Sequence, residues 1–331
     1  MQLQADVVIG LQAGDEAKGK VTHHLCKEGG YTHVLRFNGG CNAGHTIFHN
    51  GNKYVTHHIP AGVFFGIKSI IGAGCVLNVE QFFKELAELK EGGIDTENLI
   101  FVSKNTHIIT DAHIDEEQRE SKLGTTKRGN GPAYRDKYSR KGIRARDVEE
   151  LKPYLIDMYD EFYNSGQNVK ILCEGAQGFE LDIDWGDYPF VTSSHCTVAG
   201  ALLNGLPSHC VRNVWGVGKI YETYSGFKNF EPDDEIFQRI REFGEEYGAT
   251  TGRNRQCNWL DLDRLSRAIN VNGVTDLVLN KVDVLRRLGM WKLIINGQVR
   301  EFNTENEIKS FIEERVGHDL NVHFSESKER I

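Results

Sequence analysis

The sequence predicts an α/β fold built on a doubly wound, mainly parallel sheet. Short apolar runs rich in β-branched residues, such as 5–10 and 169–173, have the length and composition of buried strands. Amphipathic helical segments alternate with these runs, and that alternation is typical of a parallel sheet with helices on both faces. Glycine-rich loops follow several of the strands, where folds of this class bind their ligands. We therefore expect a P-loop-like nucleotide-binding core with substrate loops elaborated at one edge of the sheet.

The remaining elements follow from the same patterns in chain order. Further strands are predicted at 32–37, 53–58, 69–71, 100–103, 213–221, 276–279 and 321–324, and residues 188–195 are predicted to lead from a strand into a hydroxyl-rich loop. Helices are predicted from residue 20 to 27 and at 80–92, 115–122, 147–166, 235–244, 260–271 and 304–316. The glycine- and hydroxyl-rich segment 124–134 is predicted to be a loop, and the charged run 135–141 a solvated surface.

Composition limits the class of protein. No repeat, low-complexity tract or long linker divides the 331 residues, so a single domain spanning 1–331 is expected. The formal net charge of −8 argues against binding nucleic acid through bulk electrostatics. No apolar stretch is long enough to span a bilayer, and the seven cysteines lack C-x-x-C spacing, as expected for reduced thiols. Composition thus predicts a cytoplasmic enzyme without a nucleic-acid or membrane partner.

The first loop has the features of a phosphate site. Strand, glycine loop and helix start follow one another, which directs backbone N–H groups and a helix N-terminus at phosphate. Residues 14–20 have the Gly-x4-Gly-Lys spacing of a P-loop, but Val21 stands where a Ser or Thr hydroxyl normally holds Mg²⁺. Asp15 lies inside the loop instead. Its carboxylate could ligate Mg²⁺, or it could take a proton from a nucleophile at the γ-phosphate.

Three later loops carry polar side chains that suit a second ligand. Residues 38–46 place His45 at a strand end, where it could donate to a developing oxyanion; a tight turn with a solvated His is the alternative. Residues 124–134 suit a loop closing on an anion, or a plain surface loop. Residues 248–255 hold Arg253 and Arg255, whose guanidinium groups pair with carboxylates or phosphates. These arginines predict a carboxylate-bearing or phosphorylated substrate.

The segment Asn280-Lys281-Val282-Asp283 follows a predicted strand and suits a nucleobase. The Asp283 carboxylate can accept two hydrogen bonds at once, from N1–H and N2–H of guanine. Adenine offers no such pair of donors on that edge, so GTP is favoured over ATP.

Seven motifs now stand in order along the chain: GDEAKGK, NAGHT, GTTKRGNGPAY, CEGAQG, YPFVTSS, ATTGRNR and NKVD. In this set the chain resembles the adenylosuccinate synthetases, particularly their compact archaeal and phage forms. The resemblance implies a C–N-forming ligase of purine biosynthesis that joins IMP and L-aspartate at the expense of GTP, with Mg²⁺. In such enzymes the residue like Asp15 removes the N1 proton of IMP and binds Mg²⁺. O6 then attacks the γ-phosphate, the residue like His45 stabilises the leaving phosphate, and the amine of aspartate displaces phosphate from C6 of 6-phosphoryl-IMP.

Site residues carry over by motif. The resemblance implies catalytic roles for Asp15, Lys18, His45 and Gln177, and Mg²⁺ ligation by Asp15 and the carbonyl of Gly44. The implied GTP-binding residues are Gly14, Asp15, Glu16, Ala17, Lys18, Gly19, Lys20, Gly44, His45, Thr46, Arg255, Lys281, Val282 and Asp283. The implied residues for the monophosphate and aspartate are Asn42, Thr125, Thr126, Arg140, Gln177, Thr192, Ala249, Thr250, Thr251, Gly252, Arg253 and Arg255. Arg140 resembles an arginine that reaches the neighbouring subunit's site, which implies a homodimer.

The chain also departs from the family pattern. The residues that depart are Ala13 for a usual Trp, Cys41 for a usual His, Asn254 and Gln256 for usual arginines, the segment 224–232, and the tail 325–328. These departures leave a phage-type alternative, which joins dGMP or GMP to aspartate with ATP, dATP or GTP as donor. Phage-type members known to us replace the residue at Asp15 by a small one, whereas Asp15 is intact here. A non-catalytic nucleotide-binding protein and a GTPase switch are the remaining alternatives.

Overall fold

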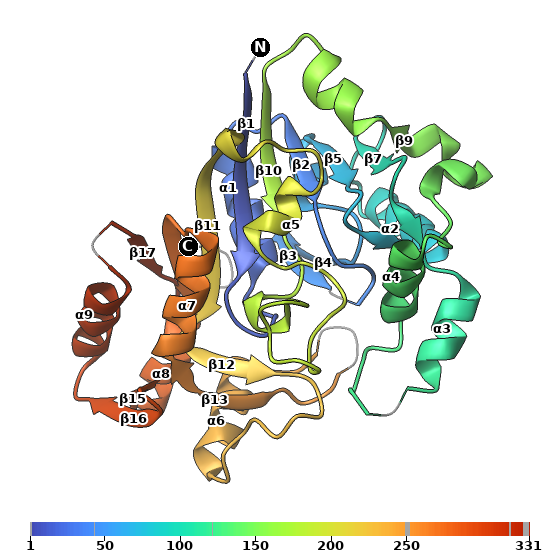
Figure 1. Ribbon diagram of the computed structural model, residues 1–331. Coiled ribbons are helices and arrows are strands. Elements are labelled where there is room, and N and C mark those ends of the chain that lie inside the picture. The colour runs from blue at the N-terminus through green and yellow to red at the C-terminus, as the bar shows by residue number, and fades with distance from the viewer. Residues whose placement is uncertain (1, 43, 121, 249–251, 318, 327–330) are drawn as a thin grey trace.

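The computed structural model describes residues 2–42, 44–120, 122–248, 252–317, 319–326 and 331. Its centre is a nine-stranded sheet in which every adjacent pair of strands is parallel (Figure 1). The strand order is β17 (Asn321–Phe324), β14 (Asp276–Asn280), β11 (Val211–Lys219), β1 (Leu3–Gly10), β10 (Val169–Glu174), β2 (His33–Arg36), β5 (Lys68–Ile71), β7 (Ile100–Ser103) and β9 (Leu155–Ile156). The predicted α/β class is confirmed.

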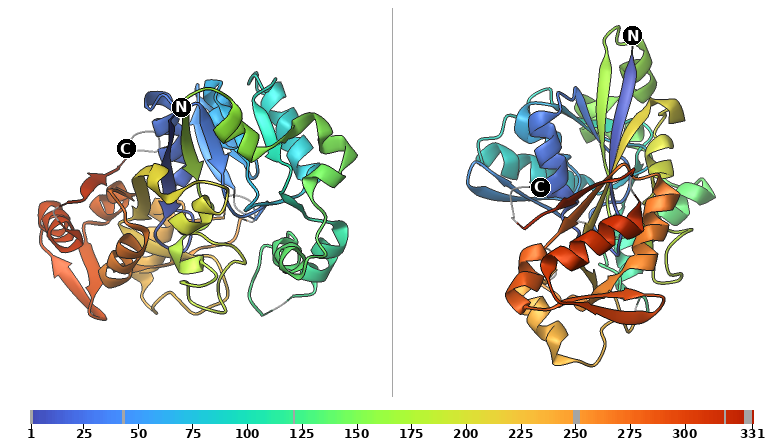
Figure 2. Two further views of the ribbon diagram at one scale, coloured as in Figure 1. Left: turned by 45° about the horizontal axis from the view of Figure 1, so that its top comes forward. Right: turned by 90° about the vertical axis from the view of Figure 1, so that its left-hand side faces the viewer.

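Alternate residues of β1 pack against opposite layers, as the pleat of a strand requires. Val7 and Ile9 are fully buried in the core that includes α7 (Leu262–Asn272), whereas Val8 packs in the core that includes α1 (Lys18–Glu28). The edge-on view shows α1 and α7 on opposite faces of the sheet (Figure 2). The sheet is therefore wound on both sides. Strand β1 is the fourth of its nine strands, next to the central strand β10, so the loop after β1 leaves from near the middle of the sheet's carboxyl edge.

The other helices lie around the central sheet and the smaller sheets. They are α2 (Val79–Glu91), α3 (Asp111–Gln118), α4 (Asn130–Ser139), α5 (Val198–Leu202), α6 (Glu235–Gly244), α8 (Val282–Leu288) and α9 (Glu305–Val316). No helix in the described part of the chain is long and apolar enough to cross a membrane.

A second, four-stranded sheet was not predicted from the sequence. Its order is β12 (Tyr221–Tyr224), β13 (Gln256–Asp261), β15 (Trp291–Ile295) and β16 (Gln298–Phe302), with one parallel pair, β13 and β15. It lies below the carboxyl edge of the large sheet in the view of Figure 1. Two small sheets pair β3 (His45–His49) with β4 (Asn52–Thr56), and β6 (Val76–Leu77) with β8 (His107–Ile108).

Three local predictions are wrong. The helix expected at 147–166 is broken into the 3₁₀ turn Glu149–Tyr154, strand β9 and the π turn Asp160–Asn164, because Pro153 lacks an N–H and obstructs a continuing helix. The loop and charged surface expected at 124–141 contain α4. Residues 188–195 form bends and turns in place of a strand.

Candidate active site

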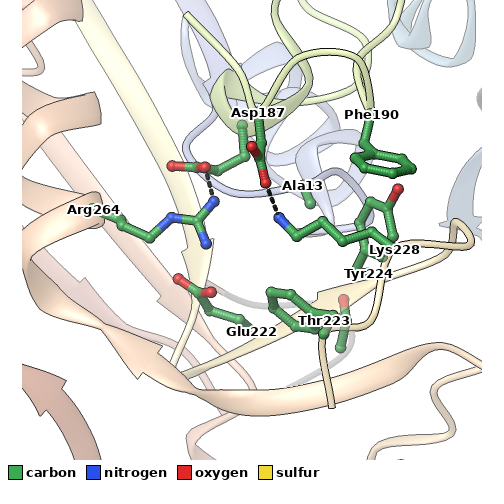
Figure 3. Close-up of a pocket in the computed structure, with 10 residues that line it drawn as sticks. Ala13, Asp187, Phe190, Glu222, Thr223, Tyr224, Lys228 and Arg264 are labelled. Carbon is green, nitrogen blue, oxygen red and sulfur yellow. Dashed lines mark hydrogen bonds and ion pairs between the residues drawn. The ribbon is translucent and has the colours of Figure 1, made fainter. Parts of the chain in front are cut away.

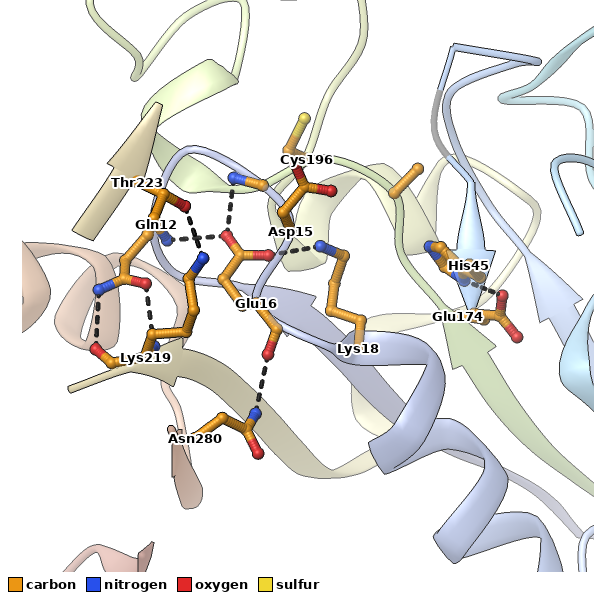
Figure 4. A network of polar contacts seen from close by, with 12 residues as sticks. Gln12, Asp15, Glu16, Lys18, His45, Glu174, Cys196, Lys219, Thr223 and Asn280 are labelled. Atoms are coloured by element: carbon orange, nitrogen blue, oxygen red, sulfur yellow. Dashed lines mark hydrogen bonds and ion pairs between the residues drawn. The ribbon is translucent and has the colours of Figure 1, made fainter. Parts of the chain in front are cut away.

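The loop between β1 and α1 is shaped by a buried carboxylate inside it. Glu16 is fully buried, and its Oε1 accepts the N–H groups of Gln12 at 3.2 Å and Gly14 at 2.9 Å. Its Oε2 lies 2.6 Å from Lys18 Nζ (Figure 4). Gly10 allows this arrangement, since a Cβ there would lie 2.6 Å from the Glu16 carboxylate. Glu16, expected among the nucleotide contacts, thus points into the loop and holds its shape, while Asp15 takes the left-handed backbone with φ 60°.

The Asn280–Asp283 segment is tied to the phosphate loop. Asn280 Nδ2 donates to the carbonyl of Glu16 at 2.8 Å (Figure 4). Lys20 Nζ contacts Asn280 Oδ1 and lies 2.7 Å from Ser325 Oγ. Burial, together with the Lys281 cation, lowers the pKa of Lys20 to about 8. The two predicted nucleotide elements are therefore adjacent at one edge of the sheet, and Asp283 is exposed in the first turn of α8.

Asp15 faces Arg255, which is far from it in the sequence. Arg255 Nε lies 2.8 Å from Asp15 Oδ2 as an ion pair, and Arg255 Nη1 donates to Glu246 Oε2 at 2.6 Å. Burial acts to lower the pKa of Arg255, but the carboxylates of Asp15 and Glu246 outweigh it and raise that pKa. Asp15 is about two-fifths exposed. The predicted base and the predicted aspartate-loop arginine thus meet.

His45 lies in a buried triad with Arg36 and Glu174 beside α1. Its Nδ1 is 2.6 Å from Glu174 Oε1, and Arg36 Nη1 donates to the same carboxylate oxygen at 2.9 Å. Burial, followed by the Arg36 cation, lowers the pKa of His45 to about 4, so its imidazole is neutral at pH 7 and Nδ1–H faces Glu174. A Cβ on Gly19 would lie 3.2 Å from His45 Cβ. His45 is thus packed against the helix that begins at the phosphate loop, which rules out a solvated turn.

Gln177 brings a third loop to the same place. Its Nε2 donates to Asn42 Oδ1 at 3.0 Å, and its buried Oε1 has no hydrogen-bond partner among the described residues. A Cβ on Gly10 would lie 2.7 Å from the Gln177 carbonyl, so this residue borders the phosphate loop directly. The ends of β2 and β10 therefore supply two of the predicted monophosphate contacts side by side.

The remaining predicted residues lie in separate places. Arg253 Nη1 donates to the carbonyl of Gly124 at 3.4 Å, which places Arg253 beside the segment of Thr125 and Thr126. Thr192 is half-buried, and its N–H donates to the Leu181 carbonyl at 2.8 Å. Arg140 is exposed at the C-terminal end of α4. Ala249, Thr250 and Thr251 lie outside the described residues.

A small pocket opens beside Ala13 (Figure 3). Ion pairs between Arg264 and Glu180 and between Lys228 and Asp187 cross it. Glu222 lines the pocket in a buried position, and burial, with the neighbouring Asp261 carboxylate, raises the pKa of Glu222 to about 8. This hollow occupies the side of the phosphate loop where Ala13 replaces the family's usual Trp.

Sequence reasoning missed the residues that support the loops. Gln12, Glu174, Lys219 and Glu246 are buried polar side chains with several hydrogen bonds each. Gln12 and Glu174 carry a sequence signal through their position alone, because they lie just beyond the carboxyl ends of predicted strands, whereas Lys219 falls inside a predicted strand and Glu246 follows a predicted helix.

Comparison with known proteins decides the family. The adenylosuccinate synthetase family profile matches residues 7–150 and 146–315. The chain belongs to the adenylosuccinate synthetase family. Its members are ligases that form a C–N bond in purine biosynthesis, so the predicted family and enzyme class are confirmed.

Individual relatives agree with this assignment. The adenylosuccinate synthetase of Thermodesulfovibrio yellowstonii is 36% identical over 360 aligned positions, covering 91% of this chain and 84% of the relative. That of Geobacillus kaustophilus is 40% identical over 353 positions, covering 89% and 82%. The fully ligated Plasmodium falciparum adenylosuccinate synthetase superposes with a TM-score of 0.86 at 28% identity, covering 98% of this chain and 97% of that one.

A phage enzyme shares the fold at lower similarity. The cyanophage S-2L succinoaminodeoxyadenylate synthetase, bound to dGMP and dATP, gives a TM-score of 0.77 at 20% identity over 98% of this chain and 93% of that one. At this identity the likeness concerns the fold alone. The family and the relatives of this chain confirm the predicted function of an adenylosuccinate synthetase. They speak against the alternative of a GTPase switch.

Proposed function

We propose that the chain joins IMP and L-aspartate to adenylosuccinate with GTP as phosphoryl donor and Mg²⁺ as cofactor. The observation that carries the proposal is the ion pair between Asp15, on the phosphate loop, and Arg255, whose Nε lies 2.8 Å from Asp15 Oδ2. A proton acceptor and a carboxylate-binding cation thereby meet where a phosphoryl group would be transferred.

GTP is proposed to bind along the phosphate loop and α8. The backbone N–H groups of 15–19 and the ammonium groups of Lys18 and Lys20 would face the phosphates, since cations and a helix N-terminus both attract them. Lys18 is paired with Glu16 in this structure, so its charge is already balanced and oriented. Asp283, exposed at the start of α8, is proposed to accept hydrogen bonds from guanine.

Asp15 and the carbonyl of Gly44 are the proposed Mg²⁺ ligands. The structure gives a fit for such an ion: an accessible carboxylate on a strained backbone, and a carbonyl next to His45, which packs against Gly19. Both are the hard oxygen donors that Mg²⁺ prefers. When bound, Mg²⁺ would offset the negative charge of the phosphates. Asp15 would take the N1 proton of IMP, which makes O6 a nucleophile towards the γ-phosphate.

IMP and aspartate are proposed to bind between three segments: the loop after β2, the loop after β10, and residues 252–255, which directly precede β13. The unpartnered Gln177 Oε1 and the Asn42 amide beside it are available polar groups for a purine monophosphate. His45, whose neutral imidazole is oriented by Glu174, would stabilise the phosphate that leaves C6. Arg253, Thr126, Thr192 and, from a second subunit, Arg140 complete the proposed monophosphate site.

Phosphate release across a grid of substrates tests this function. The purified chain is given L-aspartate and Mg²⁺ with IMP, GMP or dGMP as acceptor and GTP, ATP or dATP as donor. We expect turnover with IMP and GTP. Turnover confined to dGMP would move the chain to the phage-type reaction. Bound nucleotide without turnover on any combination would contradict catalysis.

A further inference from the structure

A buried carboxylate closes the base of the proposed aspartate loop. Glu246 is 1% exposed and follows α6, while Arg255 precedes β13. The two residues are joined twice: Arg255 Nη1 donates to Glu246 Oε2 at 2.6 Å, and the Arg255 N–H donates to the Glu246 carbonyl at 3.0 Å. The bridge between Tyr247 and Asn254 extends the same pairing. Glu246 and Arg255 therefore fix the two ends of the segment that connects them.

The other oxygen of Glu246 is held by the core. Its Oε1 accepts from Tyr221 Oη at 2.6 Å and lies 3.1 Å from Lys219 Nζ. Burial acts to raise the pKa of Glu246, but Lys219 and Arg255 outweigh it and lower that pKa to about 2. The carboxylate is thus ionised and fully partnered, which a buried charge requires.

The same cluster reaches the phosphate loop. Lys219 donates from Nζ to Thr223 Oγ1 at 2.6 Å, and its backbone N–H and carbonyl are both bound by the Gln12 amide, at 2.9 and 3.0 Å (Figure 4). Gln12 in turn donates its backbone N–H to Glu16. One continuous set of hydrogen bonds therefore runs from the phosphate loop through Lys219 and Glu246 to Arg255, and Arg255 returns to Asp15.

We propose that Glu246 is a positioning residue that orients the Arg255 guanidinium towards Asp15 and the carboxylate of the incoming amino acid, with Lys219 and Tyr221 holding Glu246 in place. A guanidinium is planar, so fixing its Nη1 edge fixes the direction of its other N–H groups. The proposal rests on the proposed function, because it assigns Arg255 to the aspartate substrate.

A purely structural role for Glu246 makes a different prediction. Removal of a buried carboxylate that only stabilised the fold would lower Tm and leave the KM values of the folded enzyme unchanged. A positioning role instead raises the KM for aspartate and lowers kcat, while the KM for IMP stays constant. The two roles are separated by comparing Tm with the individual kinetic constants.

The experiment is a double-mutant cycle in the full chain with Glu246→Gln and Arg255→Leu. We expect Glu246→Gln to raise the KM for aspartate by about 10-fold or more, an effect the size of a lost charge-assisted hydrogen bond, and to change the KM for IMP less than about twofold. In the double variant, the increase should equal that of Arg255→Leu alone, since Glu246 acts through Arg255. Independent, multiplying effects would overturn the proposal.

Two further variants keep the test decisive. Tyr221→Phe removes one hydrogen bond to Glu246 and keeps every charge, so it should fold and raise the KM for aspartate severalfold; if Glu246→Gln does not fold, an unchanged KM in Tyr221→Phe overturns the proposal. Glu161→Gln is the matched control, because Glu161 is a partly buried carboxylate that pairs with His33 and Lys68 at the amino ends of β2 and β5, away from Asp15 and Arg255. Its KM for aspartate should stay at the wild-type value. Failure of the wild-type chain to turn over IMP, aspartate and GTP would instead contradict the proposed function.

Discussion

Asp15 combines a strained backbone with a carboxylate that is paired with Arg255. Its φ of 60° lies in the left-handed region, which costs a non-glycine residue on the order of 1 kcal/mol or more. The loop around it compensates, since Glu16 accepts two loop N–H groups and the Lys18 ammonium. The carboxylate of Asp15 is held out of the loop, where Arg255 neutralises it until ligands arrive. Strain at this residue is thus tied to where its carboxylate points.

Asp15→Asn should separate binding from chemistry. The amide has the same size as the carboxylate but cannot accept the N1 proton, so kcat should fall by on the order of 100- to 10,000-fold. GTP affinity, measured by titration calorimetry without Mg²⁺, should remain close to wild type because the loop is shaped by Glu16. Near-normal turnover in this variant would remove Asp15 from the role of base.

Arg255→Leu should weaken aspartate selectively. A lost charge-assisted hydrogen bond is worth about 2 kcal/mol, which is roughly a 30-fold rise in the KM for aspartate. The fold should tolerate the change, since Glu246 keeps Lys219 and Tyr221 as partners. Steady-state kinetics with aspartate or IMP varied measures the effect. Equal increases in both KM values would contradict a specific contact with aspartate.

At the scale of the element, the phosphate loop could be predicted from sequence and its support could not. Gly-x4-Gly-Lys after a strand specifies a local backbone path, because only a few residues in sequence are involved. The contacts of Glu16, Asn280 and Arg255 join segments far apart in sequence, and no local spacing encodes them. The sequence therefore indicated which residues gather at the site, while the order of their contacts required the structure.

The second sheet was missed for a related reason. Strand β12 follows β11 after a single residue, and the strand predicted at 213–221 runs across that boundary without marking where β12 begins. Strand β16 has exposed residues on most of its length, which gives weak alternation. The helix α4 was missed because Gly129, Gly131 and Pro132 give its start a loop-like composition, although Pro fits well in the first turn of a helix.

Glu222 in β12 should make stability depend on pH. Its pKa is raised from 4.5 to about 8 by burial and by Asp261, so folding takes up a proton between these pH values. Its contribution to stability is then fully present below pH 4.5 and is lost as the pH rises through about 8. Glu222→Gln cannot ionise, so it should raise the free energy of unfolding at pH 8.5 by on the order of a few kcal/mol and change it little at pH 5.

Denaturant unfolding at the two pH values measures this difference. Glu301→Gln is the control in the same sheet, because Glu301 is exposed and pairs with Lys292 at the surface. That variant should shift stability by less than about 0.5 kcal/mol at either pH. An equal gain for Glu222→Gln at pH 5 and 8.5 would show that Glu222 does not ionise in this range.

At the scale of the whole molecule, the arrangement of strands explains why one site forms. Strands β1, β10, β2 and β14 all run parallel, so their carboxyl ends open on the same edge and bring their loops together. Alternation of apolar strands with amphipathic helices specified this arrangement, because parallel strands need long crossovers and both faces must be covered. A fold of this kind could be predicted since its signal is distributed over the whole chain.

The exposed Arg140 carries the last prediction, which concerns two chains. It ends α4 with a left-handed backbone and is exposed, so it is accessible to a neighbouring subunit. If the site is shared, Arg140→Leu and Asp15→Asn are each inactive as pure proteins, yet a mixed dimer contains one site with both native residues.

Mixing the two variants should therefore recover up to about a quarter of wild-type activity. This value holds for random exchange of subunits in equal amounts, where half of the dimers are mixed and each mixed dimer has one native site. Recovery should grow with the time allowed for exchange. It should be absent when Asp15→Asn is mixed with Lys18→Met, because each site of that mixed dimer still carries one of the two substitutions in its own phosphate loop. No recovery in the first mixture would place Arg140 outside the partner's site.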